Sequence, residues 1–163
     1  MTNQPQLKSN LIERVVQIYG DMLFDFCHSV LWSQSNAHLA FRSILKEIKK
    51  QKRTHSYNNY ERPWILKIAC EKLRSQARKH GRRLTPSEQI MLDATLKTDV
   101  RLKQFDSYFH RLSSDDQMLL LLRDKYGLPY NEIAAAMQLP EGSLKVKRQQ
   151  ALRTLEDWVW NRT

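Results

Sequence analysis

The chain has 163 residues, a formal net charge of +10 at pH 7 and 41% hydrophobic residues. This length is enough for one ordinary domain or two small ones. The longest apolar run, residues 118–122, is far too short to span a bilayer, and two cysteines exclude a disulfide framework. Since the sequence also shows no charged and then apolar leader, we expect a cytoplasmic protein without a membrane span.

The positive charge is concentrated in one segment. Residues 42–83 contain 14 Lys or Arg and 3 Asp or Glu, a net charge of +11, so the rest of the chain sums to −1. Such a block indicates a polyanion partner, because phosphate contacts supply the affinity of most nucleic-acid-binding proteins. A basic face that only contacts solvent is the alternative.

Apolar residues recur at helical spacing, with only 4 Gly and 5 Pro and no sustained two-residue alternation, so we expect an all-α fold. The first predicted helix spans residues 11–30. The second has its apolar stripe at residues 39–48, after a capping turn at 33–36. Residues 51–62 break the periodicity and predict a loop, and a third helix follows over about residues 64–80.

Residues 84–107 combine mixed charge with weak periodicity, and they predict a linker. We therefore expect two small helical domains, residues 1–83 and 108–163. The second domain opens with a polar capping cluster at residues 113–116, followed by a helix that ends before Gly127.

The C-terminal domain is predicted to contain a helix-turn-helix. Its first helix places Ile133 and Met137 on one face, Pro140 interrupts the helix, and Ser143 is a suitable N-cap for the second. Small side chains at residues 134–136 would let the two helices cross closely. The second helix would then present its first turns to the major groove of DNA.

Two groups of motifs resemble extracytoplasmic-function (ECF) sigma factors. Residues 64–69 read WILKIA and precede a basic tail to residue 83, similar to the W-L-Y-R-I-A-x-N helix of the family's second domain. The fourth domain has the patterns L-P-x-x-x-R, G-x-S-Y-x-E-I-A and I-P-x-G-T-V-K. The corresponding segments here are LSSDDQ at 112–117, GLPYNEIA at 127–134 and LPEGSLK at 139–145.

This resemblance implies a promoter-recognition sigma factor that directs core RNA polymerase to specific promoters and assists DNA melting. The first domain would bind the minus-ten element and the clamp helices of the large polymerase subunit. The second would read the minus-thirty-five element and contact the polymerase flap. The family also implies an anti-sigma factor as a regulatory partner.

DNA melting requires that the protein binds an unpaired base, by stacking or in a pocket, while cationic side chains bind the phosphate backbone of that strand. The predicted residues for the minus-ten strand and loop are Tyr57, Asn58, Asn59, Tyr60, Trp64, Lys67, Glu71, Lys72, Arg74, Arg78 and Lys79. An ordinary exposed loop is the alternative for residues 57–60, and a core position is the alternative for Trp64. Base readout comes from the first turns of a recognition helix, so we expect groove contacts from Glu141, Ser143, Lys145, Lys147 and Arg148.

Two departures from the family pattern bear on function. Residues 36–42 read NAHLAFR where the family usually has an acidic pattern, D-A-E-D-L-V-Q, that docks on polymerase. The predicted docking residues are His38, Leu39, Arg42 and Leu45. The missing acidic pattern indicates either that polymerase docking is weakened or that the docking surface lies elsewhere on the protein. Gln138 replaces a turn glycine, which costs about 1 kcal/mol if the turn requires a positive φ.

We find no sequence support for an enzyme, a cofactor or a metal site. The five histidines are scattered, and the chain contains no Gly-rich phosphate loop and no nucleophile motif. Cys27 and Cys70 lie near inward stripes, which favours buried thiols over a redox pair. Two other functions stay open: a helix-turn-helix transcriptional regulator that acts without core polymerase, and a sigma-like protein-interaction module.

Overall fold

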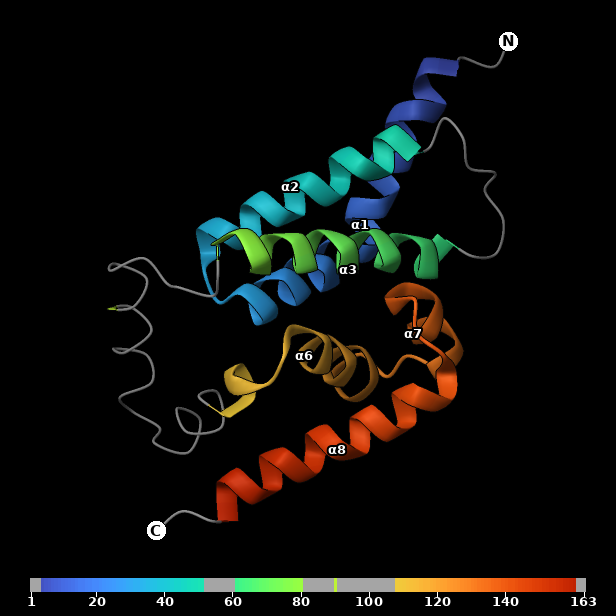
Figure 1. The fold of residues 1–163 in the computed structure, drawn as a ribbon. Coiled ribbons are helices and arrows are strands. Elements are labelled where there is room, and N and C mark those ends of the chain that lie inside the picture. Colours follow the sequence, from blue (N-terminus) through green and yellow to red (C-terminus); the bar gives the residue numbers. More distant parts are fainter. Residues whose placement is uncertain (1–3, 52–60, 81–89, 91–107, 161–163) are drawn as a thin grey trace.

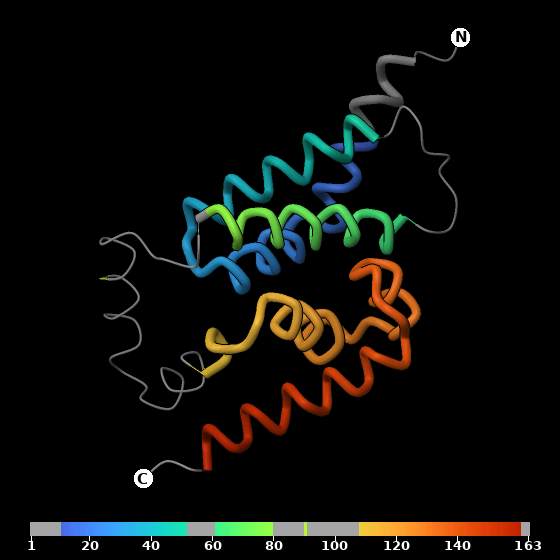
Figure 2. The backbone as a smooth tube through the Cα atoms, viewed as in Figure 1, coloured from blue at the N-terminus to red at the C-terminus, as the bar shows by residue number. Residues whose placement is uncertain are grey.

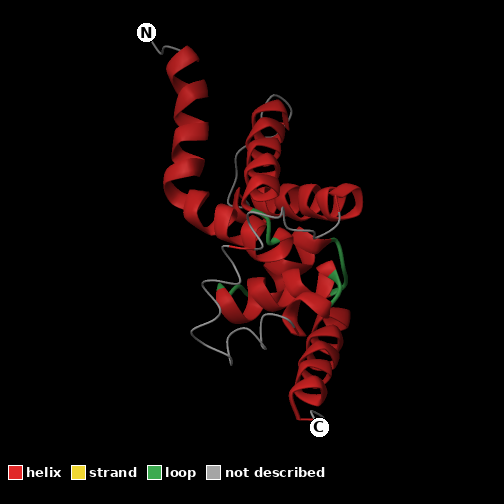
Figure 3. Cartoon of the chain, turned by 90° about the vertical axis from the view of Figure 1, so that its left-hand side faces the viewer, coloured by secondary structure: helices red, strands yellow, loops and turns green. Residues whose placement is uncertain are grey.

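A computed structural model describes residues 4–51, 61–80, 90 and 108–160, and all regular structure in these ranges is helical (Figures 1 and 3). The helices are α1 (Gln4–Leu31), α2 (Gln34–Gln51), α3 (Glu61–His80), α6 (Ser114–Leu120), α7 (Tyr130–Met137) and α8 (Glu141–Trp160), with a π-helical segment η1 (Leu121–Lys125) after α6. The predicted fold class is confirmed. The predicted linker lies, apart from Ile90, outside the described residues, so the domain boundaries stay predictions.

The N-terminal helices α1, α2 and α3 pack against one another, and α6 and α7 lie between this bundle and α8 (Figures 1 and 2). Helix α3 runs directly against α7. A single buried cluster therefore includes side chains from both halves, among them Leu23, Ile44 and Leu73 with Met118, Ile133 and Met137. A smaller cluster around Leu112 and Leu155 anchors the far end of α8.

Polar side chains cap two helices where the sequence predicts it. Ser33 Oγ accepts a hydrogen bond from the backbone N–H of Asn36 at 3.2 Å, which begins α2. Ser113 Oγ accepts one from Asp116 N–H at 3.1 Å, which begins α6. Trp32, between α1 and α2, has a left-handed backbone with φ 61. Non-glycine residues rarely take this conformation, so the surrounding packing holds it in place.

The predicted helix before Gly127 has an irregular end. After α6 the chain forms η1, in which the N–H of Tyr126 reaches the carbonyl of Leu121 at 2.9 Å. Such π segments insert an extra residue per turn and redirect the side chains that follow. None of the helices in the described ranges is long and apolar enough to cross a membrane.

Candidate nucleic-acid interface

Helices α7 and α8 form the predicted helix-turn-helix. Gln138 ends α7 in the left-handed conformation, with φ 58 and ψ 43, so the turn does require a positive φ at the position where the family has glycine. Ala136 is buried at the crossing, and Leu144 of α8 joins the shared core. This packing leaves the first turns of α8 at the surface, with Glu141 and Lys145 exposed.

The prediction that Ser143 is the N-cap of the second helix is wrong. Helix α8 already begins at Glu141, and the Ser143 hydroxyl donates to the carbonyl of Pro140 at 2.8 Å. Proline is tolerated directly before a helix, since it lacks an N–H donor and its φ is fixed, so the helix starts three residues earlier than an N-cap at Ser143 would place it. Ser143 therefore lies half-buried inside the first turn.

The Arg148 side chain is bound by a carboxylate of its own C-terminal half of the protein. Its Nε and Nη2 donate to the two carboxylate oxygens of Asp124 at 3.0 and 2.6 Å. These hydrogen bonds raise the pKa of Arg148 above its ordinary value. The side chain is half-buried, as is that of Lys147, whereas Lys145 is exposed. Among the predicted groove residues, Glu141 and Lys145 are thus the most accessible.

Two cations contact the ring of a tyrosine beside the recognition helix: Lys145, a predicted groove residue, and Arg123, which was not predicted. The guanidinium carbon of Arg123 lies 4.4 Å from the ring centroid of Tyr130, and Lys145 Nζ lies 5.6 Å from it. Cation–π contacts of this kind hold flexible side chains in one orientation. Arg123 was missed because it belongs to the helix before the helix-turn-helix, although the family-like Tyr130 could have indicated a contact point.

The predicted minus-ten residues on α3 are in different environments. Residues 57–60 lie outside the described ranges. Trp64 is buried, and its indole N–H donates to Gln51 Oε1 at 3.0 Å, which favours the core alternative for this residue. Lys67 is half-buried, and Lys72 pairs with Glu47 at 3.6 Å. The remaining exposed members of the set are Glu71, Arg78 and Lys79.

Arg74, for which a phosphate contact is predicted, connects the two halves of the protein in this structure. Its Nε donates to Asp115 at 2.8 Å, and its Nη2 donates to the Met137 carbonyl at 3.1 Å. Arg62, at the start of α3, donates through Nε and Nη2 to both carboxylate oxygens of Glu132 at 2.7 and 2.6 Å. Two arginines of the N-terminal half therefore form ion pairs with carboxylates of the C-terminal half.

A third polar link joins α1 to the residues around η1. Asp25 accepts hydrogen bonds from Tyr126 Oη and from Lys125 Nζ, the latter at 2.8 Å. Desolvation acts to raise the pKa of Asp25, but the hydrogen bonds from Lys125 and Tyr126 outweigh it and lower the pKa. Desolvation and the bond to Asp25 raise the pKa of Tyr126.

The predicted polymerase-docking residues lie on α2. His38, Leu39 and Arg42 are exposed, and Leu45 is half-buried. No cluster of His, Cys, Asp and Glu suited to a metal ion occurs among the residues that the structure describes. Cys27 and Cys70 are both buried, and desolvation raises the pKa of each thiol to about 12.

Residues 102–155 match the family model described as sigma-70, region 4. The match spans α6, α7 and most of α8, and so includes the helix-turn-helix. The whole fold is similar to that of the sigma factor RpoE of Bartonella quintana, solved in complex with the anti-sigma factor NepR. The TM-score is 0.69 at 17% identity, covering 92% of this chain and 98% of that one.

A second solved structure, CnrH in complex with the cytosolic domain of CnrY, gives a TM-score of 0.73 at 15% identity. The similarity covers 95% of this chain and 91% of CnrH. At these identities the two structures establish the fold alone, and the region 4 match concerns residues 102–155. None of the curated protein sequences matches the chain. The region 4 match thus bears out the predicted likeness of the C-terminal part to sigma factors, and the shared fold extends over most of the chain.

Proposed function

We propose that the protein is a sigma factor that directs core RNA polymerase to specific promoters and assists DNA melting. The observation that carries this proposal is the helix-turn-helix of the region 4 domain, which exposes the first turn of α8 with Glu141 and Lys145. The same fold contains the basic helix α3. The chain thus has one helix, α8, that can read duplex DNA and another, α3, that can bind the phosphates of a DNA strand.

In the proposed complex, α8 enters the major groove at the minus-thirty-five element. Lys145 is the strongest candidate for a base contact, because its ammonium is exposed and lies near the ring of Tyr130. Lysine donors recognise the acceptors of guanine in the major groove, and a good base contact contributes about 1–3 kcal/mol of discrimination. Glu141, at the entrance of the same helix, can accept a hydrogen bond from cytosine.

The proposed minus-ten contacts come from α3 and the loop before it. Arg78 and Lys79 are exposed at the end of α3 and suit phosphate oxygens. Tyr57 and Tyr60 offer ring faces on which an unpaired base can stack. We also propose that an anti-sigma factor regulates the protein, since the similar RpoE was solved with one.

Reconstitution of purified core polymerase with this protein on selected promoter DNA tests the proposal. We expect the complex to bind promoter DNA and to create permanganate-reactive thymines in the melted segment. The variant Lys145→Ala is expected to change preference among upstream promoter sequences by roughly 5- to 150-fold. Arg153→Ala, an exposed residue further along α8, is the matched control and should leave the preference unchanged.

The outcomes separate the proposal from its rivals. A protein that binds duplex DNA specifically but never associates with core polymerase would be a plain transcriptional regulator. A protein that binds neither would be an interaction module. Equal weakening of all promoter sequences by Lys145→Ala would show that this residue contacts phosphate only.

A further inference from the structure

The outward face of the first three turns of α8 is centred on uncharged residues. Leu144, Ala151 and Leu155 are buried, and they mark the side of α8 that packs on the protein. Because an α-helix has 3.6 residues per turn, residues two apart point in nearly opposite directions. Val146 follows Leu144 by two residues and Gln149 precedes Ala151 by two, so both side chains point away from the core.

Two of the predicted groove residues lie off this outward face. Lys147 and Arg148 are half-buried, and the Arg148 guanidinium is bound by Asp124. Val146, by contrast, is 54% exposed. Gln149 is exposed as well, and its side-chain amide makes no hydrogen bond within the part of the chain that the structure describes. Val146 and Gln149 are therefore available to a partner molecule.

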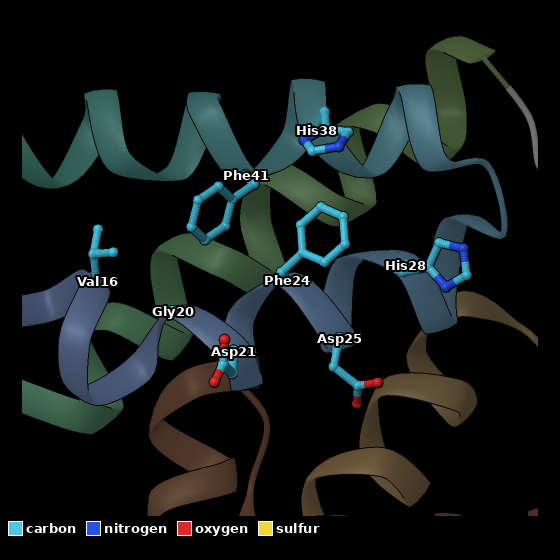
Figure 4. Close-up of a pocket in the computed structure, with 8 residues that line it drawn as sticks. All are labelled: Val16, Gly20, Asp21, Phe24, Asp25, His28, His38 and Phe41. Carbon is cyan, nitrogen blue, oxygen red and sulfur yellow. The ribbon is translucent and has the colours of Figure 1, made fainter.

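Val146 is an apolar side chain without an apolar neighbour on its helix. In the pocket of about 410 Å³ between α1 and α2, Phe24 and Phe41 are also accessible, but their rings contact each other with centroids 6.0 Å apart (Figure 4). The residues one turn before and after Val146 are polar or glycine: Gly142, Ser143, Gln149 and Gln150. A β-branched residue also favours a helix less than lysine or glutamate does. Neither packing within α8 nor helix propensity thus accounts for this valine.

The two side chains match the major-groove edge of an A·T base pair. Thymine presents its C5 methyl group there, which apolar side chains contact, and adenine presents N7 as an acceptor and N6 as a donor. A glutamine amide has both a donor and an acceptor, so it can bond both atoms of adenine at once. Guanine offers two acceptors and no donor on this edge, so it would leave the Gln149 amide oxygen without a partner.

We propose that Val146 and Gln149 recognise two neighbouring A·T base pairs, Val146 through the thymine methyl group and Gln149 through adenine N6 and N7. Residues three apart rise about 4.5 Å along a helix, close to the 3.4 Å of one base-pair step. Lys145 lies one turn before Gln149 and contacts the base pair beside these two. The inference rests on the proposed function, since it requires that α8 enters the major groove, and it adds the base pairs that α8 selects.

Selection from randomised duplexes by the complex of the full chain with core polymerase identifies the preferred sequence. We expect two adjacent A·T pairs in its upstream element. Competition binding then compares probes that are altered at single atoms of these pairs. Uracil in place of thymine removes only the methyl group and should weaken binding about fourfold. Adenine replaced by 7-deazaadenine loses only the N7 acceptor, which should weaken binding about fivefold.

Two substitutions assign each of these penalties to one side chain. Val146→Ala should reduce the uracil penalty to less than about twofold and keep the 7-deazaadenine penalty, and Gln149→Ala should do the reverse. Gln150→Ala is the matched control, because it removes the same exposed side chain one residue further along α8 and should keep both penalties. A purely structural effect would weaken binding of all probes equally and leave both penalties unchanged.

The outcomes separate this inference from the proposed function. Selected sequences without A·T pairs, or penalties that neither Val146→Ala nor Gln149→Ala changes, would overturn the inference and leave the proposed function standing. Failure of the unmodified protein to bind promoter DNA together with core polymerase would overturn both.

Discussion

Substitution of Arg74 by methionine tests whether α3 is held to the C-terminal half as the structure shows. Arg74 makes two links across this interface, to Asp115 at 2.8 Å and to the Met137 carbonyl at 3.1 Å. A hydrogen bond to a charged group contributes about 1.5–3 kcal/mol when it is shielded. The Arg74 and Asp115 side chains are 26% and 37% exposed, so solvent screening lowers this contribution.

We therefore expect Arg74→Met to lower the free energy of unfolding by about 1–2 kcal/mol, since methionine keeps most of the apolar stem. For a protein of this size, each kcal/mol corresponds to about 2–4 °C in the melting temperature, so the expected decrease is about 2–8 °C. Urea titration followed by circular dichroism measures the free energy directly.

Arg78→Met is the matched control, because Arg78 is exposed one turn further along α3. A double-mutant cycle with Asp115→Asn isolates the pair and should give a coupling energy of about 1 kcal/mol. If Arg74→Met and Arg78→Met lower stability equally, or if the cycle gives no coupling, the contact between α3 and α6 does not hold the two halves together.

Two further predictions concern the turn and the thiols. Gln138→Gly should stabilise the protein by about 0.5–1 kcal/mol. Glycine removes the cost of the positive φ, and the entropy that it adds to the unfolded chain offsets only part of this gain. Gln138→Ala keeps the strained φ, so an equal gain in stability from alanine would contradict this explanation. Cys27 and Cys70 should react slowly with a thiol reagent in the native protein. Since the folded pKa of about 12 exceeds the unfolded value of 9.0, the unfolded state loses these protons first, and stability should fall between pH 9 and 12. The variant with both residues changed to alanine should show a smaller fall, and rapid labelling without unfolding would refute the buried assignment.

The sequence predicts those features that depend on neighbouring residues. Helical periodicity places the long helices, and the serine caps follow from polar residues at helix starts, as at Ser33 and Ser113. The left-handed turn at Gln138 lies where the resembled family has a turn glycine, directly after the end of α7. Each of these depends on interactions within a few residues of the chain.

Features that depend on distant residues were not predictable in this way. Residues 118–122 are uniformly apolar, so the pattern contains no signal for the π-helical segment that follows α6. Arg74 is predicted as a phosphate contact, and Arg62 belongs to the same basic segment, because net charge identifies a cation but not its partner. Their carboxylate partners, Glu132 and Asp115, are 70 and 41 residues away in the sequence.

The contact between α3 and α7 has a consequence for promoter recognition under the proposed function. The minus-ten and minus-thirty-five elements are about 25 base pairs apart, or roughly 85 Å of duplex at 3.4 Å per base pair. Helices that touch cannot reach both elements, so the two halves must separate on the promoter. Under the proposed function, separation would expose apolar surface that core polymerase would have to cover, and phosphates would replace Glu132 and Asp115 at Arg62 and Arg74. Each kcal/mol that stabilises the closed form then lowers promoter affinity about fivefold, because binding must first open it. Asp115→Asn should therefore lower the free energy of unfolding of the free protein and raise its affinity for promoter DNA. The substitution removes the carboxylate that competes with phosphate and leaves Arg74 available.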